Sequence, residues 1–287
     1  MLAIYKKEMK AYFHSIIGYL FIGFFLFIIG LYCFMQNIYS GSSNFVYTLY
    51  GVRFFFILLI PMITMRLLAE ENHQKTDQLL FTSPVPIIKV IAGKYLAVTT
   101  MLAIVMAIVC VYPFILSHYG TMNMKQSYSG ILVLFLMGCT YLAIGMFISS
   151  VTESQAFAAI LTFVVILVTS FASIIGQVLP SNTITALRVF AIIVLLIAII
   201  TYVIIHNTTF SILFFAFGEA IVISLYYIKP SIYDGLVIKF FDWITVNSRM
   251  DDFVYGVFNV SSIVYFVSLT FLFLFLTIQA IKKRRWS

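Results

Sequence analysis

Long apolar stretches, separated by short polar ones, make up most of the chain. None of them alternates apolar with polar residues, as the strands of a membrane β-barrel would. Their length of about twenty residues is what an α-helix needs to cross the hydrocarbon core of a bilayer. The pattern predicts an all-α polytopic membrane protein with about eight transmembrane helices. The stretches lie at residues 16–37, 52–69, 91–117, 129–150, 154–178, 187–205, 209–228 and 260–281.

The pair at 187–205 and 209–228 has a second interpretation, because a tight hairpin that enters the membrane without crossing it would look the same. Eight spans, or a six-span core with an extra hairpin, both leave the two chain ends on one side. With these ends inside, the inner segments carry eleven lysines and arginines and the outer segments six. Inner segments of membrane proteins hold such an excess, so both termini are predicted to be cytoplasmic.

The composition excludes a soluble protein. Of 287 residues, 63% are hydrophobic and 9% charged, whereas a soluble domain has about a quarter charged residues. The net charge of +7 therefore reflects basic residues at the cytoplasmic face, not binding to nucleic acid. The three cysteines lie in predicted spans without disulfide or metal spacing, and we interpret them as packing residues.

Two segments outside the spans are predicted to be amphipathic. Residues 1–15 place Lys6, Lys7, Lys10 and His14 on one side of a helix and apolar side chains on the other, a pattern typical of a helix at the membrane interface. A basic end that only sets topology is the alternative. Residues 229–259 mix aromatic and charged side chains, which indicates short amphipathic helices at the extracytoplasmic interface. An interfacial aromatic belt and a role in substrate gating both fit this second segment.

The one long polar interruption between the early apolar stretches, residues 66–94, contains the acidic pair Glu70 and Glu71. Thr76 can cap a short helix that starts at Asp77. The next residues, Leu79 to Phe81, form an apolar patch too short to cross a membrane. An apolar patch held in water by polar flanks indicates a protein partner.

The residues after the patch contain a helix start signal. Ser83 is a good N-cap and Pro84 suits the first helical position, which places Pro86 in the first turn of a helix that continues into the membrane. A second start signal lies near the fifth stretch, where Thr152 and Gln155 have the spacing of a capping box.

Catalytic motifs are few. The chain has no GxxxxGK[ST] phosphate loop, so ATP hydrolysis by this chain is not expected. Glu70-Glu71 weakly resembles the EExxxR signature of intramembrane CAAX-type proteases, but Lys75 stands in place of the arginine and the histidines are scattered.

Glu219 lies near the middle of the 209–228 stretch. An ionisable side chain at that depth is costly and is often functional. It is a candidate polar residue on a translocation path, and the alternative is a carboxyl group hydrogen-bonded inside the helix bundle.

A segment that begins in the polar interruption has the pattern EExxxxTxxLLxTSPVxxxxxIxGKYLA, which resembles the cytoplasmic loop of ABC-2 type export permeases. The most similar kinds are the gliding-motility-associated and nitrous-oxide-reductase-maturation permeases. Residues 149–160 and 249–287 also resemble the family. Lys75, Gln78, Asn259 and the extra pair at 187–228 depart from it, which leaves the substrate open.

The resemblance implies a single permease domain over residues 1–287 that acts as the membrane subunit of an exporter. Two separate ATP-binding subunits would hold ATP and magnesium, a second permease copy or homologue would complete the dimer, and an extracytoplasmic auxiliary protein could join. The implied contact with the ATPase lies within residues 70–90, at Glu70, Glu71, Thr76, Asp77, Gln78, Leu79, Leu80, Phe81, Ser83 and Pro84.

The implied substrate is hydrophobic or amphipathic, such as a lipid, a peptide or a drug, exported across the cytoplasmic membrane. A stand-alone secondary transporter or channel is the competing hypothesis. Such proteins use charged or broken helices at mid-membrane, often in repeated halves. Glu219 is the one feature of that kind that we find in the sequence.

Overall fold

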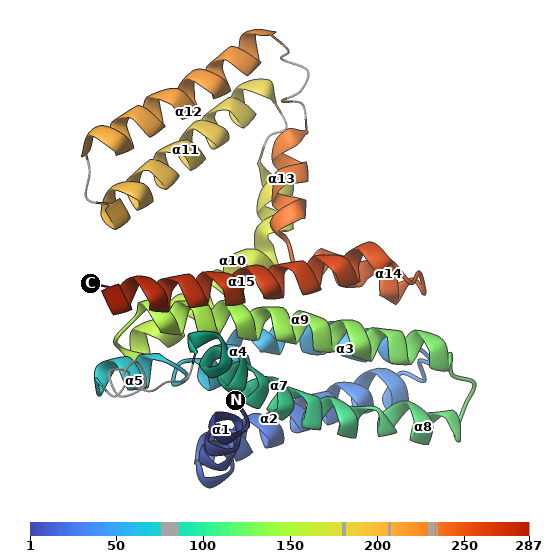
Figure 1. Ribbon diagram of the computed structural model, residues 1–287. Coiled ribbons are helices and arrows are strands. Elements are labelled where there is room, and N and C mark those ends of the chain that lie inside the picture. Colours follow the sequence, from blue (N-terminus) through green and yellow to red (C-terminus); the bar gives the residue numbers. More distant parts are fainter. Residues whose placement is uncertain (76–85, 180–181, 206–207, 229–232, 234, 287) are drawn as a thin grey trace. The chain divides into compact units, whose positions relative to one another are not determined.

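The structure is a computed structural model that describes residues 1–75, 86–179, 182–205, 208–228, 233 and 235–286. All regular secondary structure in these residues is helical (Figure 1), as the sequence predicts. Six helices are long and apolar enough to cross a membrane. They cover Ile16–Tyr39, Phe45–His73, Ile87–Ser117, Met124–Val151, Gln155–Val178 and Val260–Lys283.

The chain forms two compact units, Met1–Val168 with Arg249–Ser287, and Thr169–Ser248. The first unit starts with α1 (Leu2–His14), whose bounds agree with the predicted N-terminal helix. The segments that follow are α2 (Ile16–Cys33), η1 (Phe34–Tyr39), α3 (Phe45–Val52), η2 (Arg53–Phe55), α4 (Phe56–Thr64), α5 (Ala69–His73), α7 (Ile87–Val109), α8 (Val111–Ser117), α9 (Met124–Val151) and the first part of α10 (Gln155–Val178). The 3-10 turn η4 (Asn247–Met250), α14 (Asp251–Val254) and α15 (Val260–Trp286) follow the second unit in sequence.

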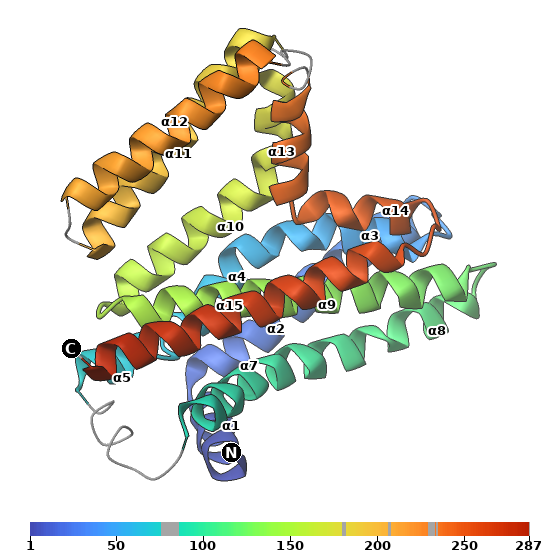
Figure 2. The same ribbon diagram turned by 45° about the horizontal axis from the view of Figure 1, so that its top comes forward.

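Helix α9 is the centre of the first unit. Its apolar window is 78% buried, the largest share of any candidate span. It lies between α15 and α7 in Figure 1, and Figure 2 shows α15 running across it. Two glycines of α9 allow its neighbours to approach closely, since a Cβ at Gly138 would meet Leu102 of α7 and one at Gly145 would collide with Thr64 of α4. The Thr140 hydroxyl is also 3.1 Å from the Phe266 carbonyl oxygen on α15.

A buried arginine connects α14 to η2, within the second candidate span. Arg53 is 9% exposed, pairs with Asp251 at 3.2 Å, and lies 3.4 Å above the centre of the Tyr50 ring. The amide of Gln126, on α9, donates to the Val254 carbonyl at 2.7 Å. These contacts fix the end of the bundle opposite to α1 and α5, which is the end predicted to be extracytoplasmic.

The second unit contains the rest of α10, α11 (Thr183–Ile205), α12 (Thr208–Ile228) and α13 (Leu236–Ile244). Its core consists of Ala186, Tyr233 and Val237 with apolar neighbours from the adjoining helices. The predicted pair at 187–228 is thus two helices, and Gly218 allows α12 to approach Val194 on α11. Within the described residues these helices contribute only the shorter apolar segments Thr183–Leu195 and Ile212–Ile228.

The count of eight spans is therefore not confirmed, and whether the hairpin crosses the membrane stays a prediction. The short helices expected in residues 229–259 are present as α13 and α14. The side of the membrane on which they and the chain ends lie, and the grouping of residues 1–287 as one permease domain, also stay predictions.

Two predicted helix starts are wrong in detail. The Thr152 hydroxyl donates back to the Ile148 carbonyl of α9, and Ser154 accepts from the Phe157 N–H instead. Pro86 is not in a first turn but has extended geometry just before α7. Proline lacks an N–H donor, and the N-cap position needs none.

Gly145→Ala should lower the free energy of unfolding by about 1–3 kcal/mol, because its Cβ would overpack the buried Thr64 side chain. Thermal unfolding of the purified protein in detergent measures the effect. Gly23→Ala is the matched control, since Gly23 is a helical glycine with no atom near its would-be Cβ. The control should be neutral or stabilising by up to about 1 kcal/mol. Equal losses in both variants would contradict the close packing of α4 on α9.

Candidate functional site

A turn interrupts the second candidate span between α4 and α5. The turn is closed by hydrogen bonds from Met65 N to the Pro61 carbonyl at 2.9 Å and from Leu67 N to the Thr64 carbonyl at 3.1 Å. The first backbone N–H groups of a helix have no acceptor within the helix, so those at the start of α5 need partners from elsewhere. Ser149, at the end of α9, accepts from the backbone N–H groups of Leu68 at 3.1 Å and Ala69 at 2.9 Å. The position of α5 is therefore fixed by α9.

A buried lysine lies beside this turn. Lys94 is in the second turn of α7 and its side chain is 2% exposed. Its Nζ donates to Glu8 Oε1 at 3.0 Å, Glu71 Oε1 at 2.9 Å and the Leu67 carbonyl oxygen at 2.8 Å. An ammonium group has three N–H donors, and here each has an acceptor. We call Lys94, Glu8, Glu71 and the Leu67 carbonyl the Lys94 cluster.

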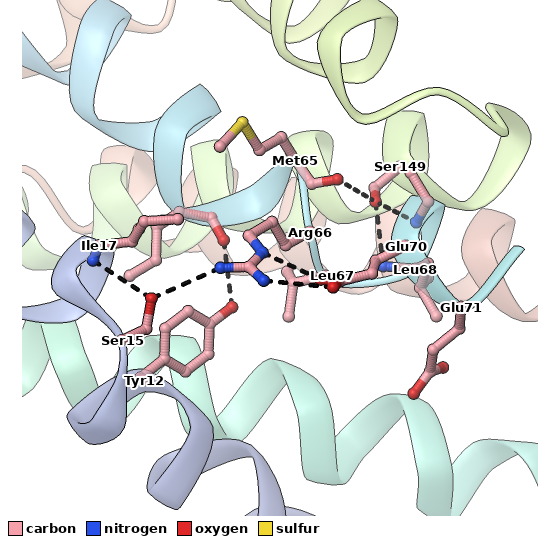
Figure 3. Close-up of polar contacts among 12 residues, drawn as sticks. Tyr12, Ser15, Ile17, Met65, Arg66, Leu67, Leu68, Glu70, Glu71 and Ser149 are labelled. Atoms are coloured by element: carbon pink, nitrogen blue, oxygen red, sulfur yellow. Dashed lines mark hydrogen bonds and ion pairs between the residues drawn. The ribbon is translucent and has the colours of Figure 1, made fainter. Parts of the chain in front are cut away.

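The two adjacent glutamates have different partners. Glu70 accepts two hydrogen bonds from Arg66, at 2.9 and 3.2 Å, whereas Glu71 points to the other side (Figure 3). Bidentate pairs of this kind are strong and fix both side chains. The third guanidinium nitrogen of Arg66, Nη1, lies 3.5 Å from the hydroxyl of Ser15, at the junction of α1 and α2. Glu70 and Glu71 thus connect α5 to two different neighbours.

Helix α1 is held by three further contacts. The Tyr12 hydroxyl donates to the Ile63 carbonyl at 3.1 Å (Figure 3). Burial raises the pKa of this hydroxyl, and the nearby Glu8 carboxylate raises it further, so it remains a donor. The Tyr5 hydroxyl donates to Thr100 at 3.2 Å. A Cβ at Gly93 would lie 3.3 Å from Ile4 Cβ, which shows how closely α1 approaches α7.

The α9–α10 turn joins the same end of the bundle. The Asn72 amide donates to the carbonyl oxygens of Thr152 at 3.1 Å and Ser150 at 3.4 Å. Four segments that are distant in sequence, namely α1, α5, α7 and the end of α9, are thus connected by polar contacts at one end of the molecule. The segment between α5 and α7 begins and ends at this polar junction.

Of the residues expected to contact an ATPase, Glu70 and Glu71 lie in this junction. Thr76, Asp77, Gln78, Leu79, Leu80, Phe81, Ser83 and Pro84 lie outside the described residues. Their role stays a prediction. What is described is the base of their segment, where α5 ends at His73 and α7 begins at Ile87.

Glu219 belongs to the other unit and is not part of this junction. It is partly exposed on α12, next to Gly218, which approaches α11. Within the described part of the chain, no hydrogen bond or ion pair of Glu219 is found. The described residues also contain no group of three or more His, Cys, Asp or Glu side chains that could hold a metal ion.

The sequence interpretation missed Glu8 and Ser149 and gave Lys94 no partner. Two signals were available. Glu8 is the only acidic residue of α1, and α7 carries Lys89 and Lys94 near its start but no acidic residue that could pair with Lys94. A charge in such a position needs a partner. Ser149 gave no signal, because its role depends on a contact between non-adjacent helices.

The sequence model described as ABC-2 family transporter protein matches residues 2–187, which include α1, α5, α7 and α9. No curated protein and no solved structure matches the chain.

Lys94→Met should lower the free energy of unfolding by about 3–5 kcal/mol, because two buried carboxylates lose their shared cation. Thermal unfolding in detergent measures the loss. Lys89→Met, at an exposed lysine on the same helix, is the control and should change stability by less than about 0.5 kcal/mol.

Adding Glu8→Gln and Glu71→Gln to Lys94→Met should restore part of the lost stability, since no unpaired charge then remains buried. A triple variant no more stable than Lys94→Met would contradict the interpretation of the Lys94 cluster as a charge-balanced unit.

Proposed function

Because the chain belongs to the ABC-2 family of transporter proteins and is a membrane subunit of an ABC transporter, we propose that it works with two separate ATP-binding subunits and a second permease copy. The complex exports a hydrophobic or amphipathic substrate, such as a lipid, a peptide or a drug. The proposed location is the cytoplasmic membrane, with both chain ends inside.

In this proposal, ATP hydrolysis by the partner ATPase supplies the energy for transport. The sequence has no phosphate loop, so ATP and magnesium would be bound by the ATPase. The permease is then a non-catalytic subunit whose task is to convert movement of the ATPase into movement of its own helices. An element with two stable positions can transmit such a change.

The observation that supports this task most directly is the base of the segment between α5 and α7. Glu71 at one end of that segment and Lys94 beyond its other end are joined at 2.9 Å in a buried site. A force applied to residues 74–86 would therefore act on α5 and α7 together. Through Glu8, it would also act on α1.

In the proposed mechanism, the ATPase binds the apolar residues Leu79 to Phe81. Closure of the two ATP-binding subunits displaces this segment and moves the helices joined at the Lys94 cluster as one body. Paired movement in two permease copies then alternates access to a path between them. An extracytoplasmic auxiliary protein could receive the substrate on the other side.

Two other functions have less support. A stand-alone secondary transporter or channel would depend on Glu219, and it would transport without an ATPase. An intramembrane protease would need Glu70 and Glu71 free to activate water, but each is engaged by a cation at 2.9 Å. ATP dependence of transport, or its dependence on an ion gradient instead, separates the exporter from the secondary transporter.

Leu79→Glu combined with Leu80→Glu should abolish co-purification of the ATP-binding subunit or uncouple its hydrolysis from transport, because two added charges would oppose burial of the apolar patch. Affinity purification of the tagged permease, followed by measurement of ATP hydrolysis in vesicles, tests this.

The matched control is His73→Glu combined with Gln74→Glu, which adds two carboxylates at exposed positions of the same region. The control should leave the complex intact. If the Leu79/Leu80 variant also leaves the complex and its transport intact, the assignment of the ATPase contact is wrong.

A further inference from the structure

Helix α1 turns its only acidic side chain inward. Glu8 is 12% exposed and lies 3.0 Å from the buried Lys94. The lysines of α1 face outward, and Lys6, Lys7 and Lys10 are all exposed. No carboxylate of α1 itself is left on that face to balance them. The exposed surface of this helix is therefore basic, and we call Lys6, Lys7 and Lys10 the basic face of α1.

Apolar side chains flank the basic face. Leu2 is 73% exposed, and Phe13 is also exposed, near the junction with the first span. The Phe13 ring contacts the Tyr19 ring, with 6.2 Å between their centres, and Tyr19 is itself exposed at the start of α2. Aromatic side chains at the end of a span are typical of the membrane–water interface. The side chains at this end of α1 therefore suit the membrane–water interface better than bulk water.

The connection to the first span restricts where the basic face can be. A single residue, Ser15, separates α1 from α2. Lys10 precedes the start of α2 by six positions, which is about 9 Å along a helix. Charged lysine side chains do not enter the hydrocarbon core. Because these lysines lie so close to a span, they remain within reach of lipid headgroups.

We propose that the basic face of α1 binds anionic phospholipid headgroups at the membrane surface. Lysine ammonium groups attract anionic lipids strongly near the surface. The adjoining Leu2 and Phe13 side chains suit the acyl boundary beside the headgroups. An acidic protein surface would match the lysines but would not account for the exposed apolar side chains on the same helix.

The inner side of α1 makes this site rigid. Glu8 is bound to Lys94, and Tyr12 is bound to the Ile63 carbonyl. The helix is therefore already ordered before a lipid arrives, so little further ordering opposes binding. The site does not depend on the ATPase or on the exported substrate.

The test uses Lys6→Gln combined with Lys10→Gln in the full chain. Lys7 stays unchanged because its Nζ is 3.7 Å from Glu71 of the Lys94 cluster. Fluorescent phosphatidylglycerol and fluorescent phosphatidylcholine are titrated onto the purified chain in detergent, without ATPase. The affinity for phosphatidylglycerol should fall about fivefold for each lysine removed. The affinity for phosphatidylcholine and the unfolding temperature should not change.

The matched control is Lys125→Gln combined with Lys239→Gln. Both residues are exposed and lie in segments predicted to be on the other side of the membrane. The control has the same net charge as the test variant and should retain the wild-type affinity for phosphatidylglycerol.

The proposal is overturned if Lys6→Gln with Lys10→Gln keeps its affinity for phosphatidylglycerol, or if the control loses as much affinity as the test variant. A test variant that retains phosphatidylglycerol but no longer co-purifies the ATP-binding subunit would show that the basic face contacts protein instead.

Discussion

A lysine can be buried only where each of its N–H donors finds an acceptor, because removing a charge from water costs several kcal/mol even after the protein relaxes. Lys94 satisfies this condition with acceptors from three segments: Glu8 on α1, Glu71 on α5 and the Leu67 carbonyl in the turn before α5. One side chain on α7 therefore fixes the relative positions of α1, α5 and α7. The rest of this end of the molecule depends on that arrangement.

Charge balance and backbone capping act together here. Arg66 pairs with Glu70, which leaves Glu71 to pair with Lys94. The Ser149 hydroxyl accepts hydrogen bonds from the first N–H groups of α5. The turn that interrupts the second span thus has partners from α1, α7 and α9. The segment between α5 and α7 starts and ends at these contacts, so it cannot be displaced without moving the helices bound there. This is how the proposed coupling would work.

Sequence alone could predict elements but not their partners. Apolar stretches of about twenty residues fix the existence of membrane helices, and helical periodicity gave α1 its bounds. Glu8 and Lys94 are 86 positions apart, and no local pattern shows that they meet. Their pairing depends on the close approach of α1 to Gly93. The 187–228 pair also shows a limit, since length and hydropathy do not separate a crossing hairpin from one that only enters the membrane.

The central claim, that α1 and α7 move as one body, can be tested with a disulfide between them. A Cβ at Gly93 would lie 3.3 Å from Ile4 Cβ, close to the separation in a disulfide. In Ile4→Cys with Gly93→Cys, ATP hydrolysis by the complex reconstituted in vesicles should be the same with the disulfide oxidised or reduced. Hydrolysis that stops on oxidation and returns on reduction would show that α1 and α7 must separate, and would contradict the account.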